Sequence, residues 1–151
     1  MQTIKWSQDM SLGVPEMDQA HKAFLEELTA LLTVSDEQFG SPFLSLVARI
    51  ERDFREEEDL MEDLDYLGIT GHREQHARIL GALHQIASRV MEGDIALGRE
   101  ALALLPQWFM FHLSTMDTAL AFALDVEKED GHSAIQAAKE RIQHEGNRTS
   151  W

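Results

Sequence analysis

The sequence predicts an all-α protein, an up-down-up-down four-helix bundle with an irregular N-terminal segment and a short C-terminal helical extension. Apolar residues recur at intervals of three and four residues over four long stretches, which is the pattern of an amphipathic helix. Short segments that contain glycine or proline separate these stretches, and no stretch alternates with the period of two typical of a strand. Long amphipathic helices with short links favour an antiparallel bundle.

The first two helices are expected at about 18–33 and 42–64. Gly13 and Pro15 indicate an irregular start, and Asp18 is the expected N-cap of the first helix. The apolar stripes of these helices consist of Phe24, Leu25, Leu28, Leu31 and Leu32 in the first, and Val47, Ile50, Phe54, Met61 and Leu64 in the second.

Two further helices, at about 71–92 and 95–125, complete the predicted bundle. A glycine-containing segment precedes each of them. Pro106 lies inside the fourth helix, where its missing N–H and its ring predict a kink or a break.

The chain is expected to contain one domain and a tail. Residues 1–125 hold the four helices and form the predicted bundle domain. Residues 126–151 begin with a charged run and form the predicted tail. Within this tail, residues 133–144 carry a thin apolar stripe that predicts a fifth, short helix.

The composition excludes several classes of function. The 27 acidic residues outnumber the 13 lysine and arginine residues, which gives a net charge of −14. Such a surface repels phosphate groups and anionic lipids, so we expect neither nucleic acid nor a membrane as partner. The absence of cysteine excludes disulfides and thiolate metal sites. No apolar run could span a membrane and the first residues do not resemble a signal peptide, so we expect a cytoplasmic protein.

Polar side chains interrupt each apolar stripe at positions where a core residue is expected. These residues are His21 in the first helix, Asp53 and Glu57 in the second, His72 and His76 in the third, and His112 and Asp117 in the fourth. They lie early, late, early and late along successive helices, which corresponds to one end of an antiparallel bundle. One such histidine would be an ordinary core residue in most proteins, but the whole set predicts a polar layer inside the bundle.

Metal ions would compensate the cost of such a layer, because unpaired carboxylates are expensive to bury. His72 and His76 are one helical turn apart, as are Asp53 and Glu57, so the members of each pair can reach the same ion. Imidazole and carboxylate ligands without sulfur suit iron, manganese or zinc. The ligands are too many for one tetrahedral zinc and fit two ions. The polar pair of the fourth helix is five residues apart, about 140° around an ideal helix, so its spacing alone does not make it a pair of ligands.

Four segments of the chain carry a recognisable pattern. They are Trp6 with Leu12-Gly-Val-Pro-Glu-Met-Asp-Gln-Ala-His-Lys22, then Glu57-Glu-Asp-Leu-Met61, then His72-x-x-x-His76, and finally Trp108-x-x-x-His112-x-x-x-x-Asp117. In this order and spacing they resemble the hemerythrin family, and more closely its bacterial single-domain members. The resemblance covers about residues 6–120. The first segment is similar to the family's V-G-I-x-x-I-D-x-Q-H-K pattern, and the second to its E-E-x-L-M run.

The resemblance implies a four-helix bundle with two iron ions in an oxo- or hydroxo-bridged non-heme centre that binds O2 reversibly, for carriage, storage or sensing. By matching position it implies that His72, His76 and His112 hold one iron, that His21 holds the other, and that Glu57 and Asp117 bridge the two. The family also implies a dry pocket beside the iron. Candidates for its lining are Phe54, Met61, Trp108, Phe109 and Met116.

One ligand position departs from the family pattern, because Asp53 stands where the family has a histidine ligand of the second iron. Three interpretations stay open. Asp53 can bind the iron and favour its ferric state, since carboxylate is a hard anionic ligand. It can be too short to reach, so that water completes the second iron. Or the second ion can be lost or exchanged, which leaves a mononuclear site.

The sequence thus leaves open whether the protein is an enzyme. Its expected small-molecule partners are O2, another small diatomic molecule or a peroxide, and no protein partner can be named. The alternative to reversible O2 binding is a di-iron oxidase or peroxidase, or an enzyme that acts on nitric oxide, which Asp53 favours. A third interpretation is iron storage or a metal-dependent interaction module, and the simplest remaining alternative is a plain helical bundle that holds zinc or no metal.

Overall fold

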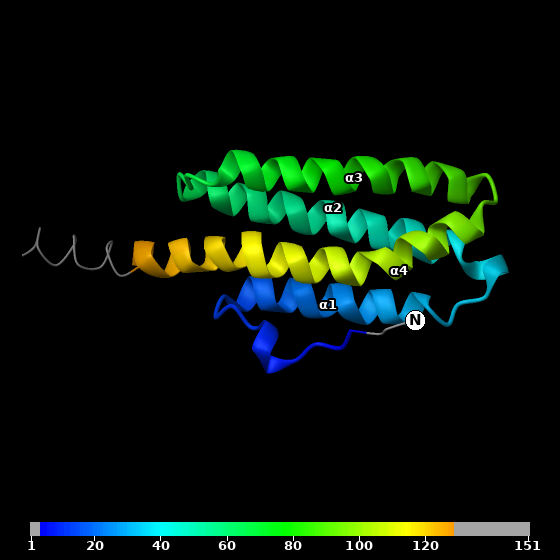
Figure 1. Cartoon of the computed structure of the whole chain (residues 1–151), viewed down its shortest axis with the longest axis horizontal. Helices are drawn as coiled ribbons and strands as arrows, with labels where there is room; N and C mark the ends of the chain where they lie inside the picture. Colours follow the sequence, from blue (N-terminus) through cyan, green and yellow to red (C-terminus); the bar gives the residue numbers. More distant parts are fainter. Residues whose placement is uncertain (1–3, 129–151) are drawn as a thin grey trace, which may run out of the picture.

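In the computed structural model of the chain, residues 4–128 are described, and four long helices lie side by side (Figure 1). Their bounds are Pro15–Leu31 for α1, Gly40–Asp63 for α2, Ile69–Met91 for α3 and Ile95–His112 for α4. Helices adjacent in the sequence pack against each other, and the described residues contain no strand. The prediction of an all-α four-helix bundle is confirmed.

The first helix begins earlier than predicted. Pro15 occupies its first turn, where a missing N–H costs nothing and a fixed φ favours helix, so Asp18 is not the N-cap. The carboxylate of Asp18 instead accepts hydrogen bonds from the Leu12 N–H at 2.8 Å and from the Ser11 hydroxyl at 2.6 Å. Asp18 therefore ties the irregular N-terminal segment to α1.

The irregularity predicted in the fourth helix lies at another position. α4 runs through Pro106 without ending there, so the predicted break is wrong. The helix changes at η3, Leu113–Asp117, which is one turn of π-helix, and residues 118–128 continue as helix. The Leu113 carbonyl accepts hydrogen bonds from both the N–H and the hydroxyl of Thr118, the latter at 2.7 Å, so the i to i+5 pattern satisfies this carbonyl twice.

The apolar core has two parts. The larger part fills the bundle from its middle to the end where α1 leads into α2, and it includes Leu28, Phe43 and Leu102. The smaller part consists of Met17, Met61 and Leu120 at the other end. A buried polar layer lies between them, about one turn along each helix from the smaller cluster.

The predicted boundary of the tail stays a prediction. The helix after η3 continues past residue 125 to 128, and the helix predicted at 133–144 lies outside the described residues. Within residues 4–128, no helix has the length and apolar character needed to cross a membrane.

Candidate metal centre

The polar layer brings together residues from all four helices of the bundle. Each lies on the core-facing side of its helix, because it continues the spacing of three or four residues set by its buried apolar neighbours. The side chains that converge are His21 from α1, Glu57 from α2, His72 and His76 from α3, His112 from the end of α4, and Asp117 from η3. Each of these side chains is at most 10% exposed.

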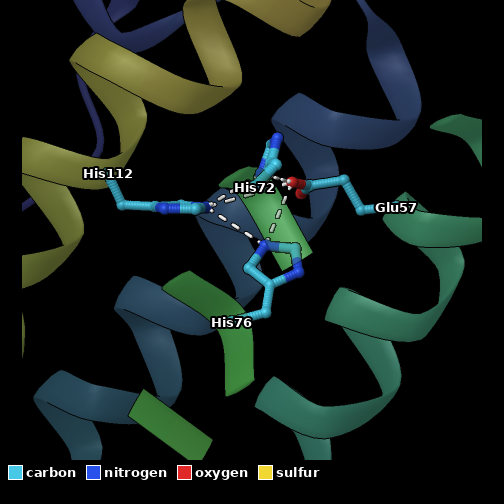
Figure 2. A group of neighbouring side chains, drawn as sticks. All are labelled: Glu57, His72, His76 and His112. Atoms are coloured by element: carbon cyan, nitrogen blue, oxygen red, sulfur yellow. Dashed lines mark hydrogen bonds and ion pairs between the residues drawn. The ribbon is translucent and has the colours of Figure 1, made fainter. Parts of the chain in front are cut away.

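Three imidazoles and one carboxylate form the first group of donor atoms, and Figure 2 shows them pointing toward one another. The Nε2 atoms of His72 and His76 each lie 3.2 Å from Nε2 of His112. Oε1 of Glu57 lies 2.6 Å from Nε2 of His72 and 3.4 Å from Nε2 of His76. All three rings therefore present the same nitrogen, Nε2, to one small volume.

His21, Glu57 and Asp117 form a second group beside the first. Glu57 belongs to both groups. Asp117 also spans them, because its Oδ2 lies 3.0 Å from Nε2 of His21 while its Oδ1 lies 3.1 Å from Nε2 of His112. Two carboxylates are thus placed between the first group and His21, which is the arrangement expected of bridging ligands.

The π-turn explains how Asp117 reaches this position. In an α-helix, residues five apart point in directions about 140° apart. The i to i+5 hydrogen bonds of η3 widen the turn, so that His112 and Asp117 face the same side. The pairing implied by the family resemblance thus has a local structural cause, which the α-helical spacing alone did not supply.

The carboxylates and imidazoles of the layer stabilise one another's charged forms. Burial alone would raise the pKa of Asp117, but the surrounding imidazoles hold it well below its usual range. The pKa of Glu57 is likewise lowered by the three imidazoles against the effect of burial. Burial opposes charging of His72, yet the two carboxylates raise its pKa to about 9. The geometry therefore favours ionised carboxylates and a positive charge between them.

The donor set fits metal ions. Oε1 of Glu57 and Oδ1 of Asp117 are buried without a hydrogen bond, although both lie close to ring nitrogens that point into the layer. A metal–imidazole distance of about 2.1 Å places neighbouring ligand nitrogens of one ion about 3 Å apart, close to the observed spacing. Imidazole with carboxylate is the donor chemistry of iron, manganese and zinc sites.

Two residues that the sequence analysis missed contact the histidines of the polar layer. Nδ1 of His76 lies 3.3 Å from Oε2 of Glu58, and the other carboxylate oxygen of Glu58, Oε1, accepts a hydrogen bond from Nε of Arg73. Nδ1 of His112 lies 3.0 Å from Oε1 of Gln75. Such partners fix the orientation and tautomer of a metal-binding histidine. In the sequence Glu58 stands among Glu56, Glu57 and Asp59, a pattern typical of a solvated face, and no spacing rule links Gln75 to another helix.

Asp53 lies apart from both groups. Its side chain is half-buried, and it is not among the donors that lie within 4.8 Å of one another. Burial raises its pKa to about 6, while Arg49 and Arg52 act in the opposite direction. Whether Asp53 binds a metal therefore stays a prediction.

A small cavity adjoins the polar layer, with a volume of about 40 Å³ for the centres of water-sized molecules. Phe54, Trp108 and Phe109 line this cavity, together with His21, Asp53 and Asp117 among others, and its role as an O2 pocket stays a prediction. Aromatic rings also cover the ligands: Phe54 stacks on His76 at 3.7 Å between centroids, and Trp108 stacks on His112 at 4.7 Å.

Two predicted lining residues lie elsewhere. Met61 packs with Met17 and Leu120 in the smaller apolar cluster, and Met116 does not line the cavity. The sequence spacing placed both near the layer, but Met61 lies one turn beyond it, and Met116 is a partly buried residue within the π-turn.

Comparison with known proteins agrees with this geometry. The family model "Hemerythrin HHE cation binding domain" matches residues 12–124. A bacteriohemerythrin of Ralstonia nicotianae is 35% identical over 117 residues, which cover 78% of this chain and 85% of the relative. One of Pseudomonas paraeruginosa is 26% identical over 131 residues, covering 82% and 83%.

The fold has solved counterparts as well. A crystal structure of a hemerythrin mutant superposes with a TM-score of 0.75 at 18% identity, covering 82% of this chain and 98% of that chain. This likeness concerns the fold alone. Since the family model spans most of the chain and the Ralstonia relative exceeds 30% identity, the chain belongs to the hemerythrin family.

Proposed function

We propose that this protein is a non-heme di-iron protein that binds O2 reversibly. One observation carries the proposal: two buried donor groups share Glu57 and are spanned by the two oxygens of Asp117. A single ion would use only one of these groups. Family membership supports iron as the metal, and the sulfur-free donor set is compatible with it.

Each residue has a distinct proposed role. His72, His76 and His112 would hold one iron and His21 the other, and Glu57 and Asp117 would supply carboxylate oxygens to both. When bound, the iron pair supplies electrons that O2 can take up and return. The carboxylates keep the negative charge that balances the cations, since the pKa values of both are lowered in the layer.

The chain itself controls access of water. The cavity beside the layer has room for O2 or a few waters, and aromatic side chains form much of its wall. Phe54 and Trp108 lie flat against the rings of His76 and His112, so they shield the ligands from solvent. A dry cavity slows the side reactions that would oxidise the iron irreversibly.

A second candidate is an oxidase or peroxidase that acts on O2, another small diatomic molecule or a peroxide. The position of Asp53 in the cavity wall favours it. The family pattern has a histidine at this position, and its neutral imidazole carries no charge. A carboxylate there adds negative charge and stabilises the oxidised state of nearby iron.

The visible spectrum after anaerobic reduction and exposure to O2, together with iron content, tests the proposal. We expect about two irons per chain and a charge-transfer band that appears with O2 and disappears under vacuum. A stable oxidised spectrum, with turnover on peroxide and a reductant, would instead establish the second candidate. After reconstitution with excess iron, a content of one or none per chain would contradict both. His84→Ala serves as the control, because His84 is exposed and lies near Glu51 rather than in the layer.

A further inference from the structure

We propose that Asp53 is not a metal ligand, and that the two donor groups therefore bind metal unequally. The first ion is held tightly by Glu57 and three histidines. The second is held weakly by His21, Glu57 and Asp117, and exchanges readily. This inference rests on the proposed di-iron site and concerns how that site fills.

The number of donors differs between the two groups. The first contains four donor residues and the second contains three. Glu57 is common to both groups. The second group contains a single imidazole, that of His21, whereas the first contains three. The remaining coordination positions of the second ion must be filled from solvent or by a small ligand.

The surroundings of Asp53 argue against its ligation. Each converging side chain is at most 10% exposed, and Asp53 is not among them. No hydrogen bond or ion pair in residues 4–128 fixes its carboxylate. Aspartate also reaches less far than histidine. Its carboxylate oxygens lie two bonds beyond Cβ, whereas the Nε2 atom of a histidine lies three bonds beyond Cβ.

Asp53 also stands between two openings. It lines the inner cavity with His21 and Asp117, and it lines a pocket of about 70 Å³ between α1 and α2 with Glu16 and Glu56. Glu57 and Ala20 line both as well. The open side of the second ion therefore faces space that reaches toward solvent, which favours exchange.

The experiment is an anaerobic titration of the metal-free full chain with Co2+, followed by calorimetry and by the visible spectrum of the bound ion. The decisive variant is Asp53→His, and Asp59→His is the matched control. Both substitutions remove one negative charge from α2, but Asp59 is exposed and points away from the layer. Charge loss alone weakens binding of a cation, so a gain in affinity reports a new ligand.

The expected result is two unequal binding steps in the unchanged protein. Partners that only orient a ligand are worth about 10–100-fold in metal affinity, and a direct ligand is worth no less. We therefore expect Asp53→His to strengthen the second step by about tenfold or more, while Asp59→His leaves it unchanged or slightly weaker.

Other outcomes separate this inference from the proposed function. Two equal steps in the unchanged protein, with no gain in Asp53→His, would overturn the inference and leave the di-iron proposal intact. No second ion in any variant would overturn both. Should Asp53→His fail to fold, Asp53→Ala decides, with Asp59→Ala as the control for the loss of one negative charge from α2. Relative to this control, a tenfold loss in the second step would identify Asp53 as a ligand, and a change below about threefold would support the proposal.

Discussion

Replacing Phe54 with alanine separates the two tasks of one side chain, packing and shielding. Phe54 is 8% exposed and belongs to the larger apolar core. Its ring lies parallel to that of His76, with 3.7 Å between centroids, and it lines the cavity beside the metal layer. The substitution therefore removes core volume and opens a path for water to the ligands.

The expected loss of stability is about 3–5 kcal/mol, the usual range for removing a buried phenyl ring. For a chain of this size each kcal/mol lowers the melting temperature by about 2–4 °C, so the midpoint falls by roughly 6–20 °C. Circular dichroism at increasing temperature measures this loss. Because water then reaches the layer, we also expect the oxygenated form to oxidise about tenfold faster or more, measured by the decay of its visible band.

Phe43→Ala is the matched control for this prediction. Phe43 is fully buried on the same helix and stacks on Phe39, but it lies eleven residues away from Phe54, about 16 Å along the helix. The same stability loss is expected there without faster oxidation. Equal acceleration in both variants would show that general loosening of the bundle, and not shielding by Phe54, controls oxidation.

Three further predictions concern the metal layer. Gln75→Ala should weaken binding of the first Co2+ by about 10–100-fold, because Nδ1 of His112 loses its partner; titration of the metal-free protein measures this, and an unchanged affinity would contradict the orienting role. Deleting the exposed Ser114 should convert the π-turn to an α-helix in which His112 and Asp117 are four residues apart, about 40° around the helix, so Co2+ content should stay near two ions per chain; a fall to one ion would show that the widened turn itself is needed. Removing metal with a chelator should lower the melting temperature, and restoring Zn2+ at about 100 times its Kd should return about 2.7 kcal/mol; unchanged melting would argue against binding to the folded layer.

Hydrophobic periodicity was sufficient to predict the bundle and the level of its polar layer. Four helices were expected, and their observed bounds differ from the expected ones by a few residues at most, apart from the end of the fourth. The early, late, early, late order of polar residues depends only on chain direction, which alternates in an up-down bundle. For this reason six of the predicted ligands converge in the structure.

Details set by local backbone chemistry were harder to predict. Pro106 was expected to disrupt the fourth helix, yet α4 runs through it. The actual change occurs at η3, in a sequence without proline or glycine. Periodicity assumes one turn size throughout, so it cannot reveal a widened turn, and this is why spacing alone separated His112 from Asp117.

Contacts between helices define the remaining part of the site, and no periodicity contains them. Gln75 follows His72 on α3, but its contact is with His112 on α4. Glu58 stands among other acidic residues in the sequence, and nothing in that pattern indicates its contact with His76. Asp53 shows the same limit from the other side. Its place in the sequence matches a ligand position of the family, so Asp53 lies at the height of the polar layer along α2. Ligation also depends on how far a side chain extends toward the bundle axis. A shorter side chain at an unchanged helical position can therefore turn a ligand position into part of the cavity wall.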